Sequence, residues 1–260
     1  MNNPIGIFDS GVGGTSIWKE IHALMPKEKT IYLADSKNAP YGTKSKKEIL
    51  QLSIKNTELL LQEDCKLIIV ACNTATTNAI DYLRVKYNVP FIGIEPAIKQ
   101  AALHTKSKRV GVLATKGTLS SALFQNTSKL FAEGIEIFEQ EGNGLVDLIE
   151  SGGLESDEMR QLLRSYVAPM LSSNIDCLVL GCTHYPYLIP LLEELLPSYV
   201  TIIDSGAAVA RQTKYVLEKN NLLNKANKEP QTHSFFSNTN IGVLQRLLPG
   251  KNHLVSYQDF

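Results

Sequence analysis

The sequence has no surplus of either charge, and it has no long apolar run. Its 26 lysine and arginine residues balance 26 aspartate and glutamate residues, so no overall field favours a nucleic acid or an anionic membrane as a partner. No uninterrupted apolar stretch approaches the roughly 20 residues of a membrane-spanning helix. The first residues, MNNPIGIFDSGVGG, lack the basic and apolar regions of a signal peptide. We therefore expect a cytoplasmic protein that contacts neither membrane nor nucleic acid.

Cysteine is also scarce, with four residues at Cys65, Cys72, Cys177 and Cys182. In a reducing cytosol, disulfides are the less favoured use of such thiols. The separations from Cys65 to Cys72 and from Cys177 to Cys182 do not match the close pairs of structural zinc sites, so we expect no metal centre. The thiols are therefore packing residues or reactive groups.

Short apolar runs alternate with amphipathic stretches along the chain. Eight segments have the composition of buried strands: 4–8, 30–34, 66–71, 90–94, 109–114, 135–139, 176–181 and 200–204. Apolar residues recur at helical spacing in three stretches between them: 45–63, 74–87 and 188–196. This alternation predicts an α/β fold with mainly parallel sheets flanked by helices.

A weak internal repeat overlies the alternation. GIFDSGVGG (6–14) resembles GVLATKGT (111–118), and a cysteine segment follows in each half, IIVACNTATT (68–77) and LVLGCTHYPY (178–187). The 260 residues suffice for two compact domains, so the repeat predicts two similar lobes. The alternative is that strand ends look alike in any α/β protein. The polar stretch 218–233 is expected to be an exposed loop.

Polar residues gather where the predicted strands end, which is where parallel sheets bind ligands. They are small and rich in hydroxyl groups, which suits a small polar ligand: Asp9, Ser10, Asp35, Cys72, Asn73, Thr74, Thr115, Cys182, Thr183 and His184. The glycines at 11, 13 and 14 match neither a dinucleotide fingerprint nor a phosphate loop. APYG (39–42) suits a type I turn that presents backbone donors to a carboxylate.

Two of the cysteines occupy a reactive type of position. Cys72 and Cys182 each fall between a strand and a helix N-terminus, where the helix dipole favours a thiolate. Cys65 and Cys177 precede or begin the same strands, at the opposite edge, and are expected to be packing residues. Either of the first two alone fits a buried crossover residue equally well. Their matched placement in both halves favours a functional pair.

Two thiols on opposite sides of one ligand suit racemisation. A redox pair would normally be a CxxC motif, which is absent, and a hydrolase needs only one nucleophilic cysteine. In a two-base racemase, one thiolate removes a proton and the other thiol returns one to the opposite face. Asp9 beside Cys72, and His184 or a nearby carboxylate beside Cys182, are expected to tune the two thiols.

Four motifs, IGIFDSGVGG, APYGTK, VACNTA and GCTHYP, closely resemble those of the glutamate racemase family in order and spacing. DSG at 204–206 resembles this family as well. The resemblance implies two pseudo-symmetric α/β lobes with the active site between them. It also implies cofactor-independent interconversion of L- and D-glutamate, a homodimer, and a role in bacterial peptidoglycan synthesis, cell-wall biogenesis and cell shape.

The resemblance also implies roles for individual residues. Cys72 resembles the base that acts on the D-enantiomer, and Cys182 the base that acts on the L-enantiomer. His184 resembles the partner of Cys182. The other residues that resemble substrate contacts are Asp9, Ser10, Tyr41, Gly42, Asn73, Thr74, Thr118 and Thr183.

One segment departs from the family pattern. Where members carry Cys-Pro and a second proline, GNGLVDLIESG (142–152) has Asn143, Gly144 and Asp147. Glu150 still falls where a glutamate that assists Cys182 is expected. The lobes are predicted as residues 1–97 plus 206–260, and 98–205.

Other functions remain open at this stage. An aspartate racemase, or a related two-cysteine isomerase, would share the fold. A non-catalytic binding protein would keep the polar strand ends without needing both thiols. A pyridoxal-phosphate enzyme would need a Schiff-base lysine and a phosphate cup.

Overall fold

The structure is a computed structural model that describes residues 3–224, 231–248, 250 and 253–260. Its strands are β1 (Ile5–Asp9), β2 (Thr30–Ala34), β3 (Leu67–Val70), β4 (Phe91–Gly93), β5 (Arg109–Ala114), β6 (Glu136–Glu141), β7 (Cys177–Gly181), β8 (Thr201–Ile203), β9 (His233–Ser237) and β10 (His253–Tyr257). Its α-helices are α1 (Thr15–Leu24), α2 (Lys46–Gln62), α3 (Asn73–Lys86), α4 (Ile98–His104), α5 (Lys116–Leu119), α6 (Ala122–Phe131), α7 (Leu145–Glu150), α8 (Asp157–Ser172), α9 (Ile189–Leu195), α10 (Gly206–Lys219) and α11 (Gly242–Leu247). Short 3-10 helices are η1 (Ser36–Asn38), η2 (Tyr41–Thr43) and η3 (Tyr185–Leu188).

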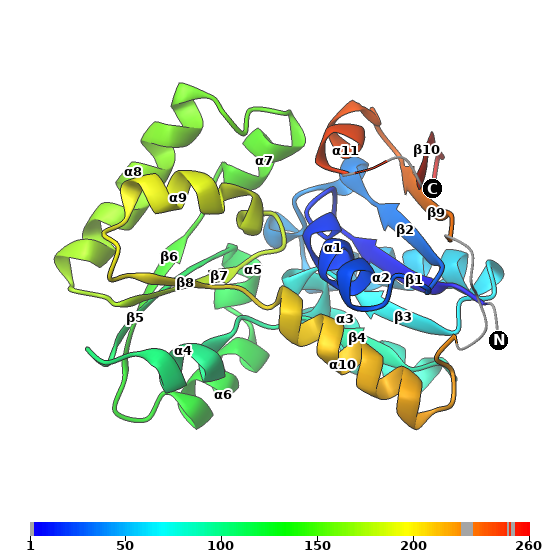
Figure 1. Cartoon of the computed structure of the whole chain (residues 1–260), viewed down its shortest axis with the longest axis horizontal. Helices are drawn as coiled ribbons and strands as arrows, with labels where there is room; N and C mark the ends of the chain where they lie inside the picture. Colours follow the sequence, from blue (N-terminus) through cyan, green and yellow to red (C-terminus); the bar gives the residue numbers. More distant parts are fainter. Residues whose placement is uncertain (1–2, 225–230, 249, 251–252) are drawn as a thin grey trace.

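The strands form two separate parallel sheets flanked by helices (Figure 1). One sheet has six strands in the order β10-β9-β2-β1-β3-β4, and the other has four in the order β6-β5-β7-β8. All neighbouring strands pair in parallel. The predicted α/β class with mainly parallel sheets is confirmed, and all eight predicted strands are present.

The internal repeat corresponds to a repeated strand order. In the larger sheet β2-β1-β3-β4 are neighbours, and β6-β5-β7-β8 are neighbours in the same sense in the smaller sheet. β3 leads to Cys72 and β7 leads to Cys182, so the two thiols occupy equivalent positions. Strands β1 and β7 are buried along their whole length, as expected of a parallel sheet covered on both faces.

Local sequence signals explain where several helices begin. The Ser45 hydroxyl accepts the amide of Glu48, and the Glu48 side chain accepts the amide of Ser45, which forms a capping box at the start of α2. Ser121 and Ser156 cap α6 and α8 through their hydroxyl groups. Local side-chain caps therefore determine where these three helices begin.

Two local predictions need correction. Pro40 is extended, with a ψ of 142°, and follows a cis peptide bond, so the type I turn predicted for APYG is wrong. The chain instead turns two residues later, where the amide of Lys44 donates to the carbonyl of Tyr41. In the predicted loop 218–233, α10 continues to Lys219, and residues 225–230 lie outside the described residues.

Strands β9 and β10 extend the larger sheet and were not predicted. β9 is half-buried, with alternate residues inward, and pairs with β2. None of the helices that the structure describes is both long and apolar enough to cross a membrane.

A buried ion pair ties the first part of the chain to the segment after α10. The Lys66 ammonium lies 2.6 Å from Glu28 Oε2 and 2.8 Å from the Leu222 carbonyl, and both charged side chains are 3% exposed or less. The amide of Asn224 donates to the other oxygen of Glu28. Every charge in this cluster is therefore hydrogen-bonded.

We expect Lys66→Met to lower the free energy of unfolding by about 3–5 kcal/mol, because it leaves the Glu28 carboxylate buried without its cation. Urea unfolding monitored by circular dichroism measures the change. The control is Lys86→Met, which removes the exposed pair between Lys86 and Glu58 and should leave the unfolding midpoint nearly unchanged. Equal losses in the two variants would contradict the expectation.

Candidate active site

The two cysteines that follow equivalent strands line one hollow of about 260 Å³. Its walls come from both sheets and from the loop between β2 and α2. The lining residues are Ser10, Pro40, Tyr41, Gly42, Cys72, Asn73, Thr74, Thr115, Val146, Cys182, Thr183 and His184. Both thiols are more than 90% buried. The arrangement places one thiol from each half of the chain against the same small space.

Cys72 is the N-cap of α3, and its sulfur accepts the amide of Ala75 at 3.4 Å. The thiol donates to the hydroxyl of Ser10 over 3.7 Å. Burial raises the pKa of Cys72 well above its ordinary value, and the charge of Asp9 raises it further, whereas the bond from Ala75 lowers it. Cys72 is therefore a thiol in this structure, ready to donate a proton.

Cys182 has a different partner. Its sulfur lies 3.7 Å from Nδ1 of His184, and Nε2 of that ring lies 2.5 Å from Oε1 of Glu150. The amide of Gly13 also approaches Nε2, at 3.2 Å. The shorter contact, with the carboxylate, fits a proton on Nε2. Glu150 is held in turn by the amide of Val12 at 2.6 Å and the hydroxyl of Ser36 at 2.7 Å.

The charges of His184 and Glu150 stabilise each other. Burial lowers the pKa of His184, but the hydrogen bonds with Cys182 and Glu150 outweigh burial and raise it well above its ordinary value. Burial raises the pKa of Glu150, but the contacts with His184 and Ser36 outweigh it and hold the pKa below the ordinary value. A cationic His184 therefore places a positive charge 3.7 Å from the Cys182 sulfur.

Asp9 ends β1 beneath the hollow and is fully buried. Its Oδ2 accepts the amide of Gly14 at 2.7 Å, and the Thr183 hydroxyl lies 3.3 Å from both of its oxygens. Burial outweighs the charge of His184 and raises the pKa of Asp9 to about 6. The hydrogen-bond partner of Cys72 is thus Ser10, and Asp9 acts on Cys72 only through its charge.

Three threonines join the two halves at one end of the hollow. The Thr74 hydroxyl lies 2.9 Å from that of Thr115, which lies 3.0 Å from that of Thr118. Nearby, Oδ1 of Asn73 is buried and accepts no hydrogen bond from the described residues. These groups offer several neutral donors and acceptors to a polar ligand.

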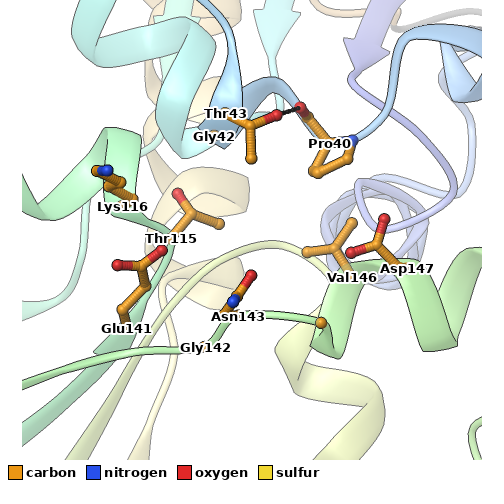
Figure 2. A pocket seen from close by; sticks show the side chains of 11 residues that line it. Pro40, Gly42, Thr43, Thr115, Lys116, Glu141, Gly142, Asn143, Val146 and Asp147 are labelled. Atoms are coloured by element: carbon orange, nitrogen blue, oxygen red, sulfur yellow. Dashed lines mark hydrogen bonds between the residues drawn. The ribbon is translucent and has the colours of Figure 1, made fainter.

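The hollow adjoins a second one of about 350 Å³, which Figure 2 shows from close by. The two share Pro40, Gly42, Thr115 and Val146 in their walls. The segment that departs from the family pattern supplies Asn143, Gly144 and Asp147, so the departure lies here, outside the cysteine pair. In Figure 2 Asn143 and Val146 lie opposite the loop that carries Pro40 and Thr43.

Most of the predicted site residues lie together. Nine of them line the cysteine hollow: Ser10, Tyr41, Gly42, Cys72, Asn73, Thr74, Cys182, Thr183 and His184. Asp9, Thr118 and Glu150 lie behind this lining, and contact Thr183, Thr115 and His184 respectively. Thr115 was predicted only as a strand-end residue, and neither Pro40 nor Val146 was predicted to line the site. The one signal for Pro40 was its place within the expected turn 39–42. There was none for Val146, an apolar residue of α7.

Gly13 faces the His184 ring. A Cβ at this position would lie 2.2 Å from Nδ1, the atom that contacts Cys182, although the φ of Gly13 is one that other residues adopt. We expect Gly13→Ala to displace the ring from Cys182 and to slow catalysis that depends on this thiol by about 10²-fold, the scale of one lost acid–base group. Steady-state kinetics measures the loss. Gly134→Ala is not a suitable control because of its positive φ, so Ala132→Gly, at the half-buried C-cap of α6 and outside the hollow, serves instead. Full activity of Gly13→Ala would contradict the assigned packing.

The sequence and fold were compared with known proteins. The profile of the Asp/Glu/hydantoin racemase family matches residues 7–213. A glutamate racemase of Ectopseudomonas mendocina is 46% identical over 95% of this chain and 93% of its own length. One of Herpetosiphon aurantiacus is 47% identical over 89% of each chain.

Solved structures agree with the sequence comparison. A glutamate racemase isoform of Bacillus anthracis superposes with a TM-score of 0.86 at 29% identity, over 99% of this chain and 97% of that one. The Escherichia coli glutamate racemase, in complex with L-glutamate and the activator UDP-MurNAc-Ala, has a TM-score of 0.85 at 32% identity, over 99% and 98%. The chain belongs to the Asp/Glu/hydantoin racemase family.

Proposed function

We propose that this protein is a glutamate racemase that interconverts L- and D-glutamate by two-base proton transfer. The observation that carries the proposal is the pair of buried cysteines, one from each repeat, on a single small hollow. Their surroundings differ, because Cys182 contacts His184 whereas Cys72 contacts a hydroxyl. Such a pair starts a reaction with one thiolate and one thiol, which is the state that two-base racemisation requires.

The proton steps follow from this asymmetry. With L-glutamate bound, the Cys182 thiolate removes the α-proton, and the electron pair of the broken C–H bond remains on the substrate as a carbanion. The Cys72 thiol then gives its proton to the opposite face, which yields D-glutamate and a Cys72 thiolate. In the reverse direction Cys72 is the base and Cys182 the acid. His184 and Glu150 hold the charge of Cys182 during these steps.

The remaining lining residues suit the rest of the substrate. The backbone at Tyr41 and Gly42, with Thr74, is proposed to bind the side-chain carboxylate. Asn73 and Thr183 are proposed to bind the α-carboxylate, with Ser10 as a further donor. The Asp9 carboxylate would retain the ammonium, and burial of the whole site keeps water from the carbanion. Thr118 is proposed to orient Thr74 and Thr115 rather than to touch the substrate.

The biological setting is part of the same proposal. D-Glutamate would serve peptidoglycan synthesis, and thereby cell-wall biogenesis and cell shape, in the cytoplasm. We propose that the reaction uses no cofactor and that the protein is a homodimer. The lobes would consist of residues 1–97 plus 206–260, and of 98–205.

Incubation of the purified protein with L- or D-glutamate in D₂O, without added cofactor, tests the proposal. We expect optical rotation to decay to zero from either enantiomer, with deuterium at the α-carbon of the product. L- and D-aspartate are tested in parallel. Racemisation of aspartate alone would overturn the substrate assignment, and inactivity on both amino acids would overturn the racemase proposal.

A further inference from the structure

The loop between β2 and α2 carries the proposed clamp for the side-chain carboxylate, at Tyr41 and Gly42. This loop has little regular structure, because it contains only the two short 3-10 helices η1 and η2. A clamp made of backbone groups binds well only where the backbone is held in place. The contacts beneath the loop therefore decide how well the clamp is formed.

Asp35 is the centre of those contacts and is fully buried. Its Oδ2 accepts the hydroxyl of Tyr41 at 2.5 Å, and its Oδ1 accepts the amides of Asn38 at 2.8 Å and Asn238 at 2.6 Å. Burial and the Asp35 charge raise the pKa of Tyr41 well above its ordinary value, so the hydroxyl remains a donor. Asp35 thus connects Tyr41 to a residue about two hundred positions later in the chain.

Asn238 reaches Asp35 because it follows β9, the parallel neighbour of β2. Ser237 pairs with Ala34, so the next residue of each strand lies at the same edge of the sheet. Besides its bond to Asp35, Asn238 accepts the backbone amide of Lys37 at 2.8 Å and donates to the carbonyl of Phe260 at 3.1 Å. One buried amide therefore holds the loop at two points.

An ion pair at the surface also joins these segments, but it is weak. Lys37 and Asp259 form an ion pair at 3.4 Å, but their side chains are 60% and 68% exposed. Water and salt screen such a pair, and it contributes little to the position of the loop. By contrast, Asn238 is 4% exposed, and its loss would leave a buried carboxylate with one donor fewer.

We propose that Asn238 is a positioning residue, which sets the substrate clamp at Tyr41 and Gly42 through Asp35. The inference rests on the proposed racemase function. Asn238 touches neither thiol, so its loss acts first on binding of the side-chain carboxylate. Proton transfer is kept as long as Ser36, in the same loop, still holds Glu150. The side-chain carboxylate of the substrate is bound alike in the ground state and the transition state, so a misplaced clamp raises KM and leaves kcat nearly unchanged.

Asn238→Ala is the test variant, and Asn240→Ala is its matched control, because Asn240 is exposed and bonds only to the Gly242 amide among the described contacts. We expect Asn238→Ala to raise KM for both enantiomers about tenfold, with kcat within about twofold of the wild type. Alkylation of Cys72 and Cys182 by iodoacetamide should proceed at the wild-type rate. The control should change none of these values.

Hydrogen exchange provides a readout that does not depend on activity. Backbone amides of residues 35–43 should exchange faster in Asn238→Ala than in the wild type, while those of β1 and β3 should not. If the wild type racemised neither enantiomer, the proposed function would fail, and the exchange rates would still decide the positioning role. Unchanged exchange in residues 35–43 would overturn it.

A reciprocal swap separates positioning from general damage. Asn238→Asp alone brings two carboxylates together and should raise KM further, whereas the double variant Asp35→Asn/Asn238→Asp restores one amide and one carboxylate. We expect the double variant to reverse at least half of the increase in log KM that Asn238→Asp causes. A loss of kcat with unchanged KM in the folded Asn238→Ala variant would also overturn the proposal.

Discussion

Cys72→Ala and Cys182→Ala are each expected to reduce racemisation by roughly 10³-fold, since each removes the acid–base group that we propose for one face of the substrate. The measurement is the rate of change of optical rotation for L- and D-glutamate. Because the two enantiomers have equal free energy, kcat/KM must fall equally in both directions. Racemisation rates therefore show that both thiols are needed, without showing which enantiomer each one meets.

Deuterium exchange assigns each cysteine to a face. In D₂O, Cys72→Ala retains Cys182 and should place deuterium on L-glutamate without forming the D-enantiomer, while Cys182→Ala should act on D-glutamate alone. Cys65→Ala and Cys177→Ala are matched controls, because these thiols are buried away from the hollow and should leave kcat unchanged. If either single variant of the pair racemised at the wild-type rate, the two-thiol mechanism would be wrong.

The sequence predicts the fold well because its strands are buried on both faces. Runs such as Leu67–Val70 and Cys177–Gly181 are continuous apolar segments, and their ends mark where polar residues meet. β9 and β10 were missed because both lie at the edge side of the sheet, are only partly buried, and contain histidine and serine. Their pairing depends on a register with β2 that no local pattern shows.

In the site, too, some features could be predicted from local sequence and others could not. Cys72, Cys182 and His184 could be predicted because each lies within three residues of the end of a strand. Direct contacts across the chain could not, because residue spacing carries no information on them. The contact between Asp35 and Asn238 joins residues from opposite ends of the chain, and the partner of Cys72 is Ser10 rather than Asp9.

Glu150→Gln is expected to reduce kcat about tenfold or more at neutral pH, because it replaces a charged hydrogen bond to His184 with a neutral one. The glutamine retains the size of the side chain, and its carbonyl can still accept the amide of Val12. The cationic form of His184 loses its anionic partner, so less positive charge remains beside Cys182, the proposed base for L-glutamate. The effect is therefore electrostatic.

The pH profile distinguishes this electrostatic effect from a packing defect. The hydrogen bond that His184 donates to the Glu150 carboxylate helps to raise the pKa of His184, so loss of that charged acceptor lowers the pKa toward the value set by burial. His184 then loses its proton at a lower pH, and the alkaline limb of the kcat profile must move to lower pH. Asp147→Asn, the same type of change in the same helix, should leave the limb in place because Asp147 is exposed and makes no described hydrogen bond to His184. A uniformly reduced profile with an unmoved alkaline limb would show that Glu150 acts on Cys182 through packing alone.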